Sequence, residues 1–298
     1  MRIGFRSLFI LVLFFTSWSL ADEARLLRFP ATNGTDIVFT HAGDLYSVPM
    51  TGGVARKLTS HDGYEMFPRF SADGQWLAFT GQYDGNTEVY VMPAAGGVPK
   101  RLTYTATLGR DDVADRMGPN NLVMTWKNTT NEIVFRSRMR SFNSFIGQLY
   151  SVGMDAGLPD QLPVPRGGFL SYSPDDKQMA YNQVFREFRT WKRYRGGRAQ
   201  EIWLFDRDSG ISRQLTRNPA TDNQPVWVGE RIYFTSDRDY QLDLYAMGPD
   251  GGEPTQVTDL PDFDVLWPSG GPDAVVFEQA GALWLHQPSS GQTRQVVV

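Results

Sequence analysis

The sequence of 298 residues contains no cysteine, three histidines and no excess of positive charge. The lack of cysteine excludes disulfides, cysteine nucleophiles and thiolate metal sites, so the fold has to be stabilised by its hydrophobic core. The histidines, His41, His61 and His286, do not have the spacing of metal ligands, and we interpret them as single polar loop or strand residues. The formal charge of −4 argues against nucleic acid as a partner.

Catalytic motifs are also missing. The sequence has no G-x-S-x-G nucleophile elbow and no H-E-x-x-H zinc motif. The acidic run over Gly109–Arg116 could hold a cation through Asp111, Asp112 and Asp115, but the adjacent arginines favour ion pairing instead. The sequence therefore predicts no catalytic residues, no metal site and no cofactor.

A long apolar run is found near the N-terminus. Arg2 and Arg6 precede the run Leu8–Trp18, and the small residues Ser19 and Ala21 precede Asp22 at the positions that signal peptidase requires. The run is short for a transmembrane span, so an uncleaved anchor is the second interpretation. We expect residues 1–21 to be a signal peptide cleaved after Ala21, the protein to be exported to the periplasm, and no membrane contact beyond that segment.

Internal repeats organise the rest of the chain. "FPRFSADGQWLAFT" (Phe67–Thr80) recurs as "FLSYSPDDKQMAYN" (Phe169–Asn182) and, shortened, as "QPVWVGERIYFT" (Gln224–Thr235). The second half of this repeat occurs six times along the chain, and each occurrence ends in an aromatic residue: Phe39, Phe79, Phe135, Tyr181, Phe234 and Phe277. Each is followed by an aliphatic–aromatic pair: Leu45-Tyr46, Val89-Tyr90, Leu149-Tyr150, Ile202-Trp203, Leu244-Tyr245 and Leu283-Trp284. A glycine-rich turn and a short final strand then complete most units.

Each unit is typical of four short strands, A to D, and lacks the 3.6-residue apolar period of a helical repeat. Repeats of this length with four strands predict an all-β, six-bladed β-propeller of four-stranded antiparallel blades, of the WD40-like or TolB-like (PD40) kind, over residues 22–298. The expected blades span about 25–60, 64–104, 120–164, 168–217, 222–259 and 263–298. The first unit begins with a strand A and the last ends with a strand D, so we expect closure without strand exchange.

One segment, Arg186–Gln200, concentrates positive charge in the predicted B–C loop of the fourth blade. Its cations are Arg186, Arg189, Lys192, Arg193, Arg195 and Arg198, and its aromatic residues, with the preceding Phe185, are Phe188, Trp191 and Tyr194. We expect this loop to project from the same face as the long loops at 104–121 and 136–147.

Two interpretations of the basic segment remain open. Arginines stacked on the aromatic rings would make it a rigid structural or docking loop. Alternatively, the six cations would bind a peptide carboxylate or an acidic partner, with Trp191 and Tyr194 anchoring the loop. Nucleic acid is disfavoured as a partner because the rest of the chain is acidic.

The chain resembles the N-terminal propeller of the tricorn protease family. The likeness is carried by "FREFRTWKRYRGGRAQEIW" (Phe185–Trp203), by Leu26–His61 and by Glu65–Thr103. The "SADG" and "SPDD" turns are less specific, because TolB-like and prolyl oligopeptidase propellers also contain them.

The resemblance implies a clasp-free, six-bladed propeller that controls the passage of peptides to a separate serine peptidase domain. In the family, a seven-bladed propeller, a PDZ domain and the peptidase domain follow it. The likeness covers the first propeller alone, so peptidase residues can be carried over to no position here. The implied partners are peptides or unfolded polypeptide and the peptidase domains of the same or a companion chain. The alternatives are a stand-alone TolB-like periplasmic scaffold and a part of a longer peptidase.

Overall fold

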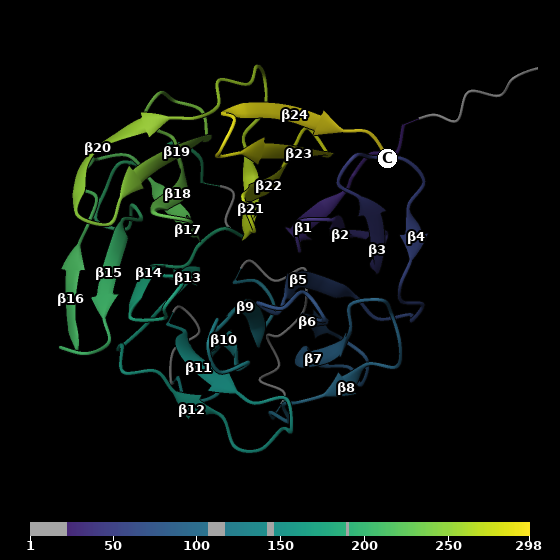
Figure 1. The fold of residues 1–298 in the computed structure, drawn as a ribbon. Helices are drawn as coiled ribbons and strands as arrows, with labels where there is room; N and C mark the ends of the chain where they lie inside the picture. Colours follow the sequence, from purple (N-terminus) through teal and green to yellow (C-terminus); the bar gives the residue numbers. More distant parts are fainter. Residues whose placement is uncertain (1–22, 107–116, 142–145, 189–190) are drawn as a thin grey trace, which may run out of the picture.

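Six β-sheets are arranged around a common axis (Figure 1). The computed structural model describes residues 23–106, 117–141, 146–188 and 191–298, and their regular structure is all β. Each sheet is antiparallel and contains four strands that are consecutive in the chain, with strand A nearest the axis. The predicted six-bladed propeller, with no strand exchanged between the first and last blades, is confirmed. The proposed signal peptide lies outside the described residues, and no helix among those described is suited to crossing a membrane.

Within every blade, strands A to D follow one another in chain order. Blades 1 to 3 contain β1 Arg28–Thr32, β2 Asp36–His41, β3 Asp44–Pro49, β4 Arg56–Lys57; β5 Glu65–Phe70, β6 Trp76–Gly81, β7 Glu88–Pro93, β8 Lys100–Arg101; β9 Leu122–Trp126, β10 Ile133–Ser137, β11 Gln148–Val152 and β12 Asp160–Gln161. Blades 4 to 6 contain β13 Leu170–Tyr172, β14 Gln178–Asn182, β15 Ile202–Asp206, β16 Ile211–Gln214; β17 Asp222–Val228, β18 Arg231–Ser236, β19 Asp243–Gly248, β20 Gly251–Gln256; β21 Leu266–Gly271, β22 Ala274–Gln279, β23 Ala282–Gln287 and β24 Gln292–Val296.

The repeated aromatic residues are cross-strand pairs between strands B and C. The register places these residues opposite each other: Phe39 and Tyr46, Phe79 and Tyr90, Phe135 and Tyr150, Tyr181 and Trp203, Phe234 and Tyr245, Phe277 and Trp284. In five blades the ring centroids are 5.8–6.4 Å apart and the rings are stacked. Cross-strand aromatic pairs stabilise antiparallel sheets, which explains why this pattern marks every blade.

The threonine that follows strand D in four blades also has a defined role. The hydroxyl oxygens of Thr59, Thr103, Thr216 and Thr258 accept hydrogen bonds of 2.8–3.0 Å from main-chain N–H groups at strand C of the same blade. All four side chains are buried. The "LT" or "VT" ending of these repeats therefore attaches the short outer strand to its blade.

Main-chain hydrogen bonds close the ring between the sixth and first blades. The N–H of Ala24 donates to the carbonyl of Val298 at 2.8 Å, and that of Gly53 donates to Val297 at 2.9 Å. Gly52 has a φ of +88°, and a Cβ there would lie 2.6 Å from the Val297 carbonyl oxygen. A glycine is therefore required for the close approach at this junction.

A bulge in strand A directs side chains toward the axis in blades 1, 2, 5 and 6. The strand register shifts at Phe29-Pro30, Phe67-Pro68, Gln224-Pro225 and Trp267-Pro268. The residue before each proline has a φ of 53–54°. Proline has no N–H to offer a ladder, and a bulge re-aims the side chain beside it. Three of the four redirected residues are aromatic, and they meet at the centre of the propeller.

Candidate functional site

The central axis is filled by an aromatic plug, which consists of Phe29, Phe67, Phe169, Phe188 and Trp267. The Phe67 ring centroid lies 4.2 Å from that of Phe29 and 5.3 Å from that of Trp267. Trp267 also lies 6.0 Å from Phe169 and 5.7 Å from Phe188. Four of the rings come from the innermost segments of blades, whereas Phe188 comes from the basic loop between β14 and β15.

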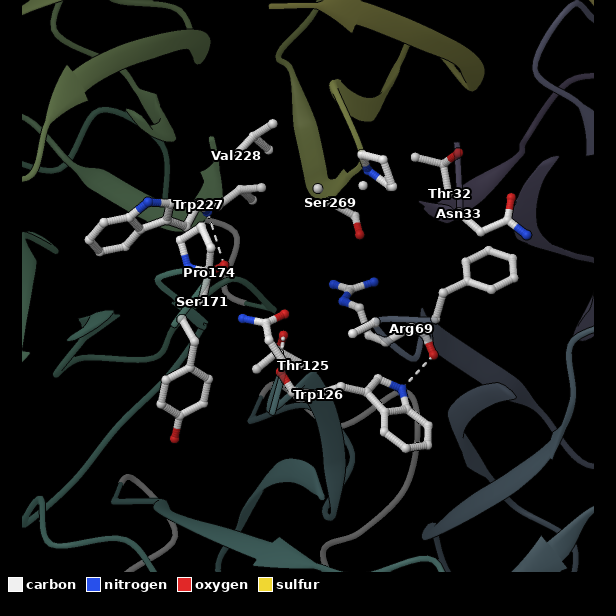
Figure 2. Close-up of a pocket in the computed structure, with 18 of the residues that line it drawn as sticks. Thr32, Asn33, Arg69, Thr125, Trp126, Ser171, Pro174, Trp227, Val228 and Ser269 are labelled. Atoms are coloured by element: carbon white, nitrogen blue, oxygen red, sulfur yellow. Dashed lines mark hydrogen bonds between the residues drawn. The ribbon is translucent and has the colours of Figure 1, made fainter. Parts of the chain in front are cut away.

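The plug separates two cavities. The turn-side cavity, of about 460 Å³, is lined by residues at the A–B turns of all six blades (Figure 2). The loop-side cavity, of about 500 Å³, is lined by blades 1, 4, 5 and 6 at the end that carries the B–C loops. Phe169 forms part of the turn-side wall and Trp267 part of the loop-side wall. Because those two rings contact each other, the plug lies between the cavities.

Four predicted site residues, Arg186, Trp191, Lys192 and Arg193, line the loop-side cavity. Arg198 instead lines a smaller cavity of about 290 Å³. Arg189 lies outside the described residues. The structure therefore brings several members of the basic segment together at one cavity, and their proposed role in binding stays a prediction.

Several of the described cations in this loop contact the neighbouring blades. Lys192 Nζ lies 2.6 Å from an Asp264 carboxylate oxygen, and Arg195 Nη1 lies 2.9 Å from Asp237 Oδ1. The Arg193 Nε–H donates to the main-chain carbonyl of Tyr240. Asp237 and Asp264 belong to blades 5 and 6, so these contacts attach the basic loop to both blades.

The aromatic residues of the loop stack with its first arginine. The guanidinium carbon of Arg186 lies 4.7 Å from the Tyr194 ring centroid and 6.0 Å from the Trp191 ring centroid. The two rings lie 5.6 Å apart, and Arg186 also donates to the Thr221 hydroxyl at 3.1 Å. Trp191 nevertheless remains 49% exposed at the cavity. This stacking matches the first interpretation of the segment, a loop made rigid by arginine–aromatic contacts.

The described parts of the three long loops contact one another, as expected for loops on one face. Arg138 donates to the carbonyl of Gly118 at 3.1 Å, and a Cβ on Gly118 would lie 2.4 Å from the Phe188 ring. The guanidinium carbon of Arg136 lies 4.1 Å from the Phe185 ring centroid. Burial lowers the pKa of Arg136 to about 9, and the nearby Arg138 adds to this effect.

Besides Asp237, two buried charged residues at the cavities were not identified from the sequence. Glu278, at the end of β22, lines the loop-side cavity, and burial raises its pKa to about 7 against the opposing effect of Arg28. Its Oε2 atom is buried with no hydrogen-bond partner in the described part of the chain. By contrast, the buried carboxylate of Glu88 accepts hydrogen bonds from Arg101 and Thr103 among others.

The second is Arg69 of β5, in the turn-side cavity. Its side chain is 8% exposed, and it donates to the carbonyls of Met124 at 2.9 Å and Pro68 at 2.8 Å. The repeats contain a signal that could have identified it. The copies in blades 4 and 6 have Ser171 and Ser269 at the matching position, so a long cation in an inward-facing strand is exceptional.

Two of the histidines, His61 and His286, make local contacts. The Nδ1 atom of His61 accepts a hydrogen bond from the Gly63 N–H, and Nδ1 of His286 lies 2.9 Å from the Thr293 hydroxyl. Burial lowers the pKa of His286. Within residues 23–106, 117–141, 146–188 and 191–298, no group of three acidic or histidine side chains is arranged for a metal ion. The predicted alternative at Asp111, Asp112 and Asp115 lies outside those residues.

Comparison with known proteins matches residues 24–292 to the tricorn protease N-terminal β-propeller domain. The chain is 29% identical over 269 residues to tricorn protease homolog 1 of Streptomyces coelicolor, which covers 87% of the chain and 23% of that protein. It is 26% identical over 278 residues to tricorn protease of Thermoplasma acidophilum, covering 92% and 25% respectively. The chain thus spans about a quarter of the length of these relatives.

Solved structures show the same architecture. A crystal structure of tricorn protease superposes with a TM-score of 0.79 and 22% identity, covering 91% of this chain and 26% of that one. TolB from Acinetobacter baumannii superposes with a TM-score of 0.62 and 20% identity, covering 83% and 57%. At these identities the structural matches establish the fold alone.

Proposed function

Because the chain belongs to the family of tricorn protease N-terminal β-propeller domains, we propose that it is a non-catalytic propeller that binds or gates peptides. We further propose that it docks to peptidase domains of the same or a companion chain. Proteolysis would then be performed by those domains. Export to the periplasm, based on residues 1–21, is part of the same proposal.

The observation that carries the proposal is the aromatic plug between two open cavities. Each cavity is within the volume range of small-ligand sites, so a short peptide segment fits either one. The rings of Phe29, Phe67 and Trp267 are in mutual contact, so a peptide cannot pass along the axis until some of them move. Phe188 lies in the loop between β14 and β15, outside the strands of the blade.

The loop-side face supports the docking half of the proposal. Long loops from blades 2 to 4 meet there, and Trp191 exposes half of its surface beside them. Exposed aromatic residues and arginines are enriched in protein interfaces. By comparison, the likeness to TolB supports the fold only, and no feature of the described residues favours the scaffold alternative.

A labelling experiment tests peptide binding. Because the chain has no native cysteine, a fluorophore reacts only with the cysteine that is introduced. A fluorophore is attached at Pro272→Cys on the turn side, at Phe263→Cys on the loop side, or at Thr255→Cys on the outer strand β20 as a control. An unfolded polypeptide that carries a quencher is then titrated. We expect saturable quenching at one or both cavity positions and none at the control position.

Equal quenching at all three positions, or no quenching at any of them, would contradict peptide binding. Docking is tested by adding separately expressed tricorn-type peptidase domains to the same labelled chains. A change confined to Phe263→Cys is expected if the loop-side face is the docking surface. Replacing Lys192 and Arg193 with alanine together then shows whether the basic loop contributes to either interaction.

A further inference from the structure

Arg69 is the single cation among the described residues that line the turn-side cavity. Figure 2 shows its guanidinium directed toward the middle of the cavity, between the six A–B turns. The side chain is more than nine-tenths buried, so the charged group is held at the floor of the cavity rather than on the outer surface.

The hydrogen bonds of Arg69 are made to neutral groups. The carbonyls of Met124 and Pro68 account for two of the five N–H donors that a guanidinium carries. In the part of the chain that the structure describes, Arg69 forms no ion pair. Burial lowers its pKa to about 10, and no neighbouring carboxylate raises it, so the group is cationic at neutral pH without a counter-charge. A buried charge of this kind is unfavourable until a partner is supplied.

The surroundings of Arg69 suit an anion of small charge. Figure 2 shows the hydroxyl side chains of Thr125, Ser171 and Ser269 around the same space. The Ser171 oxygen accepts a hydrogen bond from the Trp227 N–H at 2.9 Å, which leaves its own O–H group to donate. The Ser171 hydroxyl can therefore donate to an anion held by the guanidinium, whereas the Thr125 hydroxyl donates to the Trp126 carbonyl at 3.3 Å.

The two acids that line the cavity are already engaged. Asp73 accepts hydrogen bonds from the Ser71 hydroxyl at 2.5 Å and the Gln75 N–H at 3.0 Å, and these bonds lower its pKa. Asp273 accepts from the N–H and the hydroxyl of Ser289. With two carboxylates at the cavity and one cation at its floor, a multiply charged anion is disfavoured.

We propose that Arg69 binds a carboxylate of a peptide ligand at the floor of the turn-side cavity. A guanidinium and a carboxylate are planar and match each other in a two-bonded arrangement, and each carries one unit of charge. The inference rests on the proposed function and adds the chemical group that is recognised. The carboxylate could be the C-terminus of the peptide or the side chain of an acidic residue, and the experiment separates these sources.

The test measures binding by calorimetry in a buffer free of carboxylate and phosphate. Four probes are compared: acetyl-trialanine with a free C-terminus, its C-terminal amide, acetyl-Ala-Ala-Glu amide, and benzoate. The proteins are the wild-type chain, Arg69→Met, Arg69→Lys, and Arg56→Met as a control for an exposed arginine outside the cavity. Circular dichroism melting establishes that each variant is folded.

We expect the wild-type chain to bind one of the carboxylate-bearing peptides at least about tenfold more tightly than the amide, which corresponds to about 1.4 kcal/mol or more. Preference for the free C-terminus or for the glutamate side chain identifies the source. Arg69→Met should abolish the preference, Arg69→Lys should retain part of it because charge remains without the planar fork, and Arg56→Met should leave it unchanged. If Arg69→Met does not fold, a reduced preference in Arg69→Lys supports the site and an undiminished preference overturns it.

Equal binding of the acid and the amide by the wild-type chain, or a preference that survives in Arg69→Met, would overturn the carboxylate site while leaving peptide binding intact. Arg69-dependent binding of benzoate without binding of any peptide would support the site and contradict the proposed function. If no probe binds, the carboxylate site is wrong.

Discussion

The two cavities differ in how their charges are balanced. On the loop side, Lys192 and Arg195 are paired with Asp264 and Asp237, so neighbouring blades compensate part of the positive charge of the basic segment. On the turn side, one cation, Arg69, has no acidic partner in the described chain. The most basic segment of the sequence therefore has acidic partners on neighbouring blades, whereas the single cation of the turn-side cavity has none among the described residues.

The difference follows from burial and topology. A surface-exposed ion pair has little net energy, but it reduces the charge that a ligand meets. A buried cation without a counter-charge keeps its full field in a medium of low dielectric constant. We therefore expect substitutions in the basic loop to change stability and docking, and substitution of Arg69 to change ligand binding.

The largest expected effect is that of removing the barrier between the cavities. Phe67→Ala deletes a fully buried ring that contacts the other four rings of the plug. The free energy of unfolding, measured with urea, should fall by about 3–5 kcal/mol, because a large aromatic side chain is lost and a cavity remains. Phe67→Leu should cost clearly less. A loss below about 1 kcal/mol for alanine would show that the plug is not well packed.

The second largest effect is expected for Glu278, the buried acid of the loop-side cavity. The pKa of Glu278 is raised from 4.5 to about 7 in the folded state, so the folded chain binds more protons than the unfolded chain between these values. Its contribution therefore lowers stability as pH rises from about 4.5 to about 7, and the loss persists above that range. Glu278→Gln should be more stable than wild type at pH 8, by about 1–3 kcal/mol, and should lose this advantage near pH 4.

Glu88→Gln provides the matched control. Glu88 is also buried, but it pairs with Arg101 at 3.0 Å, so removing its charge should destabilise the chain at pH 8. Burial also raises the pKa of Glu65 to about 7. The stability of both variants should therefore still fall somewhat as the pH rises through this range. An unchanged pH profile for Glu278→Gln would show that Glu278 is ionised without penalty in the folded chain.

A smaller effect is expected where the basic loop meets blade 5. Arg195 forms two hydrogen bonds to Asp237, whose carboxylate also accepts from the Thr221 N–H at 2.7 Å. A double-mutant cycle with Arg195→Met and Asp237→Asn should give a coupling energy of about 1–2 kcal/mol, because Asp237 is buried and charged. Coupling near zero would mean that the Arg195–Asp237 pair does not help to attach the loop to blade 5.

The smallest effect is expected for the exposed pair on the same loop. The Lys192 side chain is 73% exposed, although it lies 2.6 Å from Asp264. A cycle with Lys192→Ala and Asp264→Ala should give about 0.2–1 kcal/mol, decreasing further at high salt. A coupling larger than that of Arg195 and Asp237 would reverse the order that burial predicts.

The fold was predictable because its signals are local. The aromatic residues at Phe79 and Tyr90, for example, are separated by one hairpin, so their pairing follows from strand register. The same pattern, repeated six times, indicated the number of blades and the contiguous course of each one. The location of the basic segment in a B–C loop beside the other long loops followed from the order of the strands.

The candidate sites depended on contacts between distant parts of the chain. Lys192 meets Asp264 and Arg195 meets Asp237 only because blade 4 lies beside blade 5 and the loop reaches blade 6. The sequence by itself determined the six blades and their internal pairing, because these follow from short-range periodicity, and its resemblance to known proteins indicated the family. Tertiary structure alone decided which charges are cancelled, which are buried without a partner, and that aromatic rings close the axis, because each of these depends on the relative positions of different blades.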